Sequence, residues 1–208
     1  MDNKYELIPS DIEGLFRIKA LKDFGNVKKG DIGGYIQSEN NLSQLDDCWI
    51  YDDAVVRDNA KVCHNAQIYD KVIVMGNAEV CDNAQVCDNA FVLDNAQVCD
   101  NAFVLDNAIV CDNARIRGHA VVQYDAVVRG NAQICGDAMI SSDKDYIVFK
   151  NWWSSGRFFT WTRSNNMWKV GCFYGSGEKL IAKAYKDSEE SGREYECIVK
   201  YVERILNS

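Results

Sequence analysis

The sequence has no apolar run long enough to span a membrane. It also has no basic and apolar leader, because Asp2 and Asn3 follow Met1 directly, and this argues against an export signal. Nine cysteines, an odd number, in a chain without an export signal predict free thiols in a reducing compartment rather than a disulfide framework. We therefore expect a cytoplasmic protein with no membrane partner.

Basic residues are scarce in the middle of the chain. Residues 42–143 hold 16 acidic and 6 basic residues, a net charge of −10, whereas the rest of the chain holds 15 acidic and 17 basic residues. An acidic surface repels phosphates, so we expect no direct nucleic-acid binding along this region. A protein with a basic surface, or a cation, is the kind of partner that this charge favours.

The middle of the chain is instead a repeat. Residues 42–143 divide into 17 hexads without insertion, most regularly at residues 81–108, CDNAQVCDNAFVLDNAQVCDNAFVLDNA. One position of the hexad is Val or Ile at every sixth residue from Ile50 to Ile140. A fixed short period with one β-branched and one small residue predicts a parallel β-helix.

Side-chain alternation explains the hexad. Its small residue, mostly Ala, and its Val or Ile are two positions apart, so both point inward. Asp-Asn, Gly-Asn and Gly-Asp pairs form the corners, because these residues tolerate left-handed backbone angles. Three corners close a coil of 18 residues, whose backbone pairs with the next coil at a spacing of ~4.8 Å.

The pattern Val-x-Asp/Gly-Asn-Ala-x resembles the hexapeptide repeat of left-handed β-helix proteins, and the resemblance alone implies the hand of the coil. We expect a mostly β chain with an N-terminal β cap at residues 1–41, a left-handed parallel β-helix at residues 42–143 and a small α+β domain at residues 144–208. In the cap, Gly33 and Gly34 predict a tight turn. Four of the five tryptophans lie in the C-terminal domain, either as packing for the hairpin and helices or as an aromatic ligand platform.

The hexads also resemble those of bacteriophage and prophage hexapeptide-repeat proteins. The resemblance extends to LFRIKALKDFG at residues 15–25, GDIGGY at residues 30–35 and VGCFYG at residues 170–175. It implies a location in the host cytosol if a phage encodes the chain. Acyltransferase activity is often assigned to such proteins by fold analogy, but a fold does not determine a function.

The residues argue against acyltransferase chemistry. Hexapeptide acyltransferases have a loop that bulges from a coil and a histidine that acts as general base at a subunit boundary, whereas the hexads here run unbroken. His64 and His119 lie three coils plus one residue apart, which places them ~14 Å apart on one edge. They cannot share a metal, and a γ-type carbonic anhydrase needs three histidine ligands. We expect no catalytic residue, no cofactor and no metal.

Cysteines recur in the position after the Val or Ile. The 18-residue period stacks Cys63, Cys81, Cys99 and Cys135 on one ladder, interrupted by Arg117. Zinc requires ligands that converge on it, and a linear ladder does not converge. We interpret these cysteines as small, weakly polar packing residues.

The same period sorts the outward residues into faces. One face is polar, with Lys61, Glu79, Gln97, Arg115 and Gln133, and another is mixed, with Trp49, Gln67, Gln85, Phe103, Val121 and Met139. The third is apolar, with Val55, Ile73, Phe91, Ile109 and Val127, and with Met75 and Leu93 beside them. An apolar outer face is normally covered. We predict a homo-oligomer interface there, trimeric or dimeric, with the C-terminal domain folded back over the face as the alternative.

Four aspartates stack on one corner at the coil spacing: Asp52, Asp70, Asp88 and Asp106. Asp is a good turn residue, and an acidic surface keeps the protein soluble, so a structural interpretation is open. Glycine, however, serves at other corners and never on this edge, and like charges at this spacing repel. A basic groove or cations would relieve the repulsion, so we expect this edge to bind a protein partner with a basic surface.

The sequence therefore predicts a non-enzymatic, phage-type interaction protein that binds a macromolecule and inhibits a host defence or nucleic-acid-binding enzyme. Two alternatives stay open. One is an acyl-CoA-dependent acyltransferase with a site between subunits, and the other is a structural component of a particle.

Overall fold

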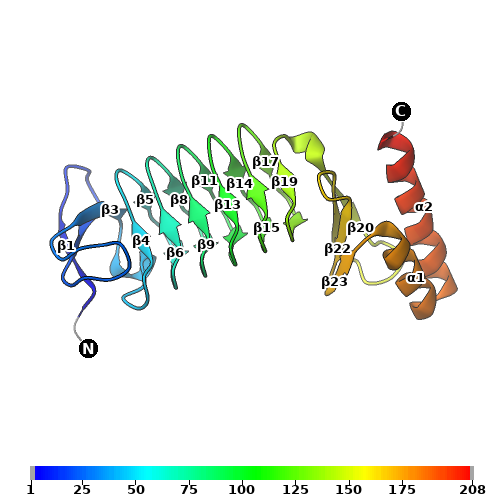
Figure 1. The fold of residues 1–208 in the computed structure, drawn as a ribbon, viewed down its shortest axis with the longest axis horizontal. Coiled ribbons are helices and arrows are strands. Elements are labelled where there is room, and N and C mark those ends of the chain that lie inside the picture. Colours follow the sequence, from blue (N-terminus) through cyan, green and yellow to red (C-terminus); the bar gives the residue numbers. More distant parts are fainter. Residues whose placement is uncertain (1–2, 207–208) are drawn as a thin grey trace.

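The computed structural model describes residues 3–206 as an elongated, mostly β chain (Figure 1). Antiparallel strands lie at one end, a solenoid of parallel two-residue strands forms the middle, and an antiparallel sheet with two helices lies at the other end. The predicted fold, a parallel β-helix with a small C-terminal α+β domain, is therefore confirmed. No helix in the described part of the chain is long and apolar enough to cross a membrane.

The solenoid has three faces, which we name by their outward residues. The apolar face consists of β5 (Val55–Val56), β8 (Ile73–Val74), β11 (Phe91–Val92), β14 (Ile109–Val110) and β17 (Val127–Val128). The polar face consists of β6 (Lys61–Val62), β9 (Glu79–Val80), β12 (Gln97–Val98), β15 (Arg115–Ile116) and β18 (Gln133–Ile134). The mixed face consists of β4 (Trp49–Ile50), β7 (Gln67–Ile68), β10 (Gln85–Val86), β13 (Phe103–Val104), β16 (Val121–Val122) and β19 (Met139–Ile140).

Each strand pairs in parallel with the strand 18 residues away. Phe91 is opposite Ile109 on the apolar face, and Gln97 is opposite Arg115 on the polar face. The inward Ala, Val and Ile of the hexads are buried and form one continuous core along the solenoid. The alternation in the sequence thus predicts the interior residue by residue.

The corners show why Asp is so frequent in the repeat. Each Asp that opens a corner adopts a left-handed conformation, with φ of 54° at Asp70 and 62° at Asp88. Its carboxylate then accepts the amide N–H of the residue one coil later, as in the 3.1 Å bond from Asp88 N to Asp70 Oδ2. The second residue joins an amide ladder, for example Asn59 Nδ2 to Asn77 Oδ1 at 3.1 Å. Both corner residues therefore link successive coils.

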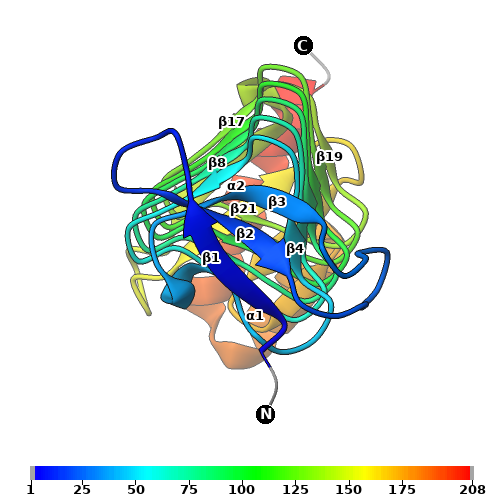
Figure 2. The same cartoon turned by 90° about the vertical axis from the view of Figure 1, so that its left-hand side faces the viewer.

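The N-terminal cap closes the first coil (Figure 2). It consists of β1 (Tyr5–Pro9), β2 (Phe16–Ala20) and β3 (Ile32–Ile36), followed by a 3-10 turn at Glu39–Asn41, and β3 pairs in parallel with β5. Lys4 is buried, and its Nζ donates to the carbonyl oxygens of Leu45, Asp46 and Cys48 at 2.9–3.2 Å. A donor-only side chain thus satisfies acceptors at the open end of the solenoid.

The predicted tight turn at Gly33–Gly34 is wrong, because both glycines lie within strand β3. A Cβ atom on Gly33 would collide with the carbonyl oxygen of Ile50, and one on Gly34 with that of Ala54. The glycines therefore permit close approach of the cap strand to the first coil rather than a left-handed turn.

The other end of the solenoid is capped by hydroxyl groups. On the apolar face, Tyr146 Oη accepts from Arg129 N at 3.2 Å and donates to Val127 O at 3.1 Å. On the polar face, Thr160 Oγ1 accepts from Gln133 N at 2.9 Å, and on the mixed face Ser164 Oγ accepts from Met139 N at 2.7 Å. Each face thus ends on a hydroxyl that replaces part of a missing coil, and Tyr174 Oη further donates to Cys135 O at 3.1 Å.

The C-terminal domain supplies these hydroxyls. After a 3-10 turn at Asp143–Asp145, it contains β20 (Tyr146–Lys150), β21 (Phe158–Thr162), β22 (Met167–Val170), β23 (Phe173–Gly175), α1 (Gly177–Asp187) and α2 (Glu189–Leu206). Trp161 and Trp168 are buried in its own core with residues of both helices, whereas Trp152 is 75% exposed. The buried pair therefore packs the sheet against the helices.

The end cap generates a prediction about stability. Tyr146→Phe removes a hydroxyl that satisfies two backbone groups, so we expect a loss of about 1–3 kcal/mol in the free energy of unfolding. Urea denaturation followed by circular dichroism measures it. Tyr124→Phe is the control, because the Tyr124 side chain is exposed, and equal stability of the two variants would contradict the capping role.

Candidate functional site

The predicted acidic edge forms the corner between the mixed and apolar faces. Its four aspartates, Asp52, Asp70, Asp88 and Asp106, follow β4, β7, β10 and β13, all have φ between 51° and 62°, and all lie exposed or half-buried. Oδ2 of each accepts the amide N–H of the residue one coil later, at 2.8–3.2 Å. This bond uses one oxygen of each carboxylate and leaves the other for solvent or a partner.

A hollow of about 430 Å³ lies along the N-terminal half of this edge and is lined by Asp52, Asp53, Asp70, Lys71, Asp88 and Asn89. Arg17 of the cap partly neutralises its first coil. The Arg17 guanidinium contacts Asp53 Oδ1 at 2.7 Å and Asp52 O at 2.9 Å. Further along, the edge carries Asp70, Asp88 and Asp106 on three successive coils, with Lys71 beside Asp70.

The predicted apolar stripe borders the acidic edge directly, because the strands of the apolar face begin two or three residues after each acidic corner. Its residues Val55, Ile73, Met75, Phe91, Leu93, Ile109 and Val127 are all half-buried in a single chain. The C-terminal domain lies beyond the last coil and does not fold back along the solenoid (Figure 1). On the mixed face, by contrast, Phe103 is 37% and Met139 48% exposed.

His64 and His119 lie on one edge, between the polar and mixed faces, as predicted. His64 occupies a left-handed corner with φ of 57°, and its Nδ1 accepts Asp82 N at 3.3 Å. The His64 ring therefore replaces the Asp carboxylate that fills this role on other coils. His119 is exposed, and its amide N–H donates to Gly136 O at 2.7 Å. Neither histidine lines the hollow of the acidic edge.

The cysteine ladder lies on the same edge as the histidines. A hydrogen bond with the Cys81 thiol, together with the neighbouring His64, lowers the pKa of Cys63 to about 7. A hydrogen bond with Cys81 also lowers the pKa of Cys99, with Arg117 as a further cause. By contrast, burial and the Asp88 carboxylate raise the pKa of Cys87, on the acidic edge, to about 12. The same hydrogen bonds with Cys63 and Cys99 raise the pKa of Cys81, so these three stacked thiols interact along the ladder.

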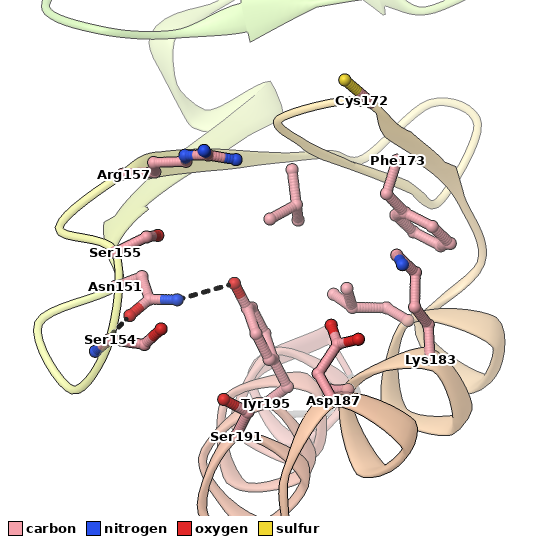
Figure 3. Close-up of a pocket in the computed structure, with 13 residues that line it drawn as sticks. Asn151, Ser154, Ser155, Arg157, Cys172, Phe173, Lys183, Asp187, Ser191 and Tyr195 are labelled. Carbon is pink, nitrogen blue, oxygen red and sulfur yellow. Dashed lines mark hydrogen bonds between the residues drawn. The ribbon is translucent and has the colours of Figure 1, made fainter.

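The structure also contains a pocket that the sequence interpretation missed (Figure 3). A cavity of about 370 Å³ lies between the C-terminal sheet and the two helices, and its polar lining includes Asn151, Arg157, Lys183, Asp187 and Tyr195. Asn151 Nδ2 donates to Tyr195 Oη at 3.1 Å, and burial raises the pKa of Tyr195, which keeps the phenol neutral. Cys172 points away from the cavity (Figure 3).

The lining of this C-terminal pocket contains no Ser-His pair. Its serines, Ser154, Ser155 and Ser191, share the pocket with Lys183, Asp187 and Tyr195 and have no histidine beside them among the lining residues. Ser154 N donates to Asn151 Oδ1 at 2.9 Å, which shows that the loop after β20 is held by its own polar groups. In the sequence, Asn151, Ser154 and Ser155 form a short segment with polar residues, which the structure places between β20 and β21, and such a segment does not by itself specify a cavity.

Comparison with known proteins supports the fold and little else. Residues 96–112 match the YdcK beta solenoid repeat family, and these residues include β12, β13 and β14 of the solenoid. The match identifies a β-solenoid repeat and covers only a small part of the chain. No curated protein matches the sequence.

The apolar stripe generates a prediction about assembly. Because the C-terminal domain leaves this face uncovered, we expect Phe91→Asp to dissociate a homo-oligomer, and sedimentation velocity measures the change. Burial of a few hundred Å² of such surface is worth several kcal/mol at ~25 cal/mol per Å², before the entropy of association. Gln97→Asp is the matched control, since it adds the same charge to the polar face six residues further along the coil. A wild-type chain that sediments as a monomer would refute the interface.

Proposed function

We propose that this chain is a non-enzymatic interaction protein that binds a basic macromolecular partner through its acidic edge. The observation that carries the proposal is the ladder of left-handed aspartates from Asp52 to Asp106, one on each coil, each held in place by a backbone N–H of the next coil. The carboxylates are therefore fixed before a partner arrives, which removes much of the ordering cost of binding.

The spacing of these charges suits a partner that recognises polyanions. One carboxylate per coil gives a negative charge every ~4.8 Å along the edge, and one strand of DNA carries a phosphate every ~3.4 Å. A Lys- and Arg-rich groove that binds a nucleic-acid strand can therefore accept the edge in its place. This supports inhibition of a nucleic-acid-binding or host-defence enzyme as the role. We assign this role to the cytosol of a host cell because the hexads resemble those of phage-type hexapeptide-repeat proteins.

Homo-oligomerisation through the apolar stripe strengthens this proposal. The acidic edge borders the apolar face, so two or three copies that bury this face would bring their acidic edges close together. Parallel edges would raise the local negative potential and the association rate with a basic partner.

The acyltransferase alternative has less support. Strands recur every six residues from Trp49 to Ile140 with no inserted loop among the coils, so the solenoid lacks the bulge that encloses an acyl-CoA in proteins of that type. A structural role in a particle would use the same surfaces without a basic partner. Calorimetric titration with an acyl-CoA tests the first alternative, and proteomics of purified particles tests the second.

The central experiment removes charge and keeps the corner. In the variant Asp70→Asn, Asp88→Asn, Asp106→Asn, each Asn tolerates the left-handed conformation and still offers an oxygen to the next amide N–H. A partner captured from host cells with the wild-type chain should bind this variant at least about tenfold more weakly, with a flatter salt dependence. Calorimetry at two or more salt concentrations measures both effects.

A matched control makes this result specific to the edge. Asp58, Asp94 and Asp112 lie on the corner between the apolar and polar faces, and their carboxylates make the same bonds to the next coil at 2.8–3.1 Å. Their replacement by Asn changes the net charge by the same amount. If both triple variants lose affinity equally, or if neither does, the acidic edge is only a solvated corner.

A further inference from the structure

The edge between the polar and mixed faces brings soft metal ligands together. Cys63, Cys81 and Cys99 stack on three successive coils. His64 follows Cys63 and Asp82 follows Cys81, and each of them lies at the corner beside the thiol that precedes it. The ligand atoms of Cys63, His64 and Cys81 all lie within 4.8 Å of one another, and so do those of Cys81, Asp82 and Cys99. Two ligand triads therefore share the thiol of Cys81.

We infer that this edge is a binding site for a thiophilic divalent cation of the Zn²⁺ class, with Cys63, His64 and Cys81 as its ligands. Zinc binds thiolate sulfur at ~2.3 Å and imidazole nitrogen at ~2.0–2.1 Å in a tetrahedron, so its ligand atoms lie roughly 3.5–4 Å apart. The distance from Cys63 Sγ to His64 Nδ1 is 3.9 Å. Three protein ligands leave the fourth position to water or to the Asp82 carboxylate.

The contacts of His64 point to a positive charge at this place. Its Nδ1 accepts the amide N–H of Asp82 at 3.3 Å, and the same atom lies 3.1 Å from Asp82 Oδ1. A neutral Nδ1 that accepts the first hydrogen cannot also donate to the carboxylate oxygen. A cation bound at Nδ1 would take over the lone pair that accepts the Asp82 N–H, and its charge would attract the Asp82 Oδ1 that lies beside it.

The surrounding charges favour a cation on the N-terminal part of the ladder and oppose it further on. Asp82 lies at this corner with its Oδ1 3.1 Å from His64 Nδ1, and Glu79 lies on the same coil as Asp82, in β9. Arg117 occupies the next step of the ladder, close to both Cys99 and Cys135. Its positive charge ends the site after the third thiol.

The other thiols of the solenoid lack this arrangement. Cys87 lies in the same hexad position on the acidic edge, where its Sγ lies 3.3 Å from Asp88 Oδ2, but Tyr69 and Leu105 occupy the neighbouring steps of its ladder, so no second thiol stacks beside it. The triad of Asp94, Cys111 and Asp112 holds one thiol and two carboxylates, a set without the second soft ligand that zinc prefers. The edge of Cys63, His64 and Cys81 is thus the better thiolate site.

The test uses Co²⁺ as a spectroscopic probe on the full chain, kept reduced with a reductant that has no thiol. The wild-type chain should develop the thiolate-to-cobalt charge-transfer absorption and the visible bands of a tetrahedral site, saturating at roughly one equivalent, and Zn²⁺ should bleach them. Cys81→Ser should abolish the charge-transfer absorption, because Cys81 belongs to both triads. His64→Asn keeps a residue suited to the left-handed corner and should weaken cobalt binding by at least about tenfold.

Cys87→Ser is the matched control and should bind cobalt like the wild-type chain. Thermal melting by circular dichroism verifies that each variant is folded, and Zn²⁺ should raise the melting temperature of the wild-type chain but not that of Cys81→Ser. The inference fails if the reduced wild-type chain shows no charge-transfer absorption, if Cys81→Ser retains it, or if Cys87→Ser loses it equally. These outcomes are independent of the acidic edge, which lies on a different corner.

Discussion

Pairing of the backbone groups between coils is the constraint on which the rest of this structure depends. Every coil presents N–H and C=O groups to the coils before and after it, and an unpaired buried group costs about as much as a lost hydrogen bond. Inside the solenoid the next coil supplies the partners. At the two ends side chains supply them, through the Lys4 ammonium group at one end and the hydroxyls of Tyr146, Thr160 and Ser164 at the other. The flanking segments are therefore shaped by the needs of the solenoid edges.

Stacking by 18 residues turns a one-dimensional period into ladders of identical chemistry. A residue type that recurs every third hexad becomes a continuous stripe, as with the aspartates of the acidic edge and the thiols from Cys63 to Cys99. Weak groups thereby act together. One aspartate or one thiol on a surface is unremarkable for binding, whereas a row of them fixed by parallel pairing offers several ligands or charges at once. The acidic edge carries a row of carboxylates, and the edge between the polar and mixed faces carries a row of thiols. This difference is the basis for assigning a basic protein to the first edge and a cation to the second.

The sequence predicted the solenoid well because its period and alternation are local properties. Spacing alone was enough to place the Val or Ile of every hexad, from Ile50 to Ile140, in the interior and to assign the corners. Features that need side-chain geometry were out of reach. The thiols and the histidines were interpreted separately, so the convergence of Cys63 and His64 with Cys81 of the next coil was missed. The C-terminal pocket depends on how two helices pack on a sheet. Gly33 and Gly34 were read as a turn because their need for space comes from a coil that follows them by some twenty residues.

The balance of energies at the acidic corners bears on what the edge can do. Adjacent carboxylates one coil apart, at ~4.8 Å, repel by about 1 kcal/mol in water. A hydrogen bond from a backbone N–H to a charged carboxylate contributes about 1.5–3 kcal/mol, and Asp70, Asp88 and Asp106 each accept one from the following coil. The bond therefore outweighs the repulsion, and the ladder is stable without a partner. The edge therefore does not need a basic partner to stay folded. When such a partner binds, its positive charge relieves the repulsion between the carboxylates, and this relief adds to the affinity of the complex.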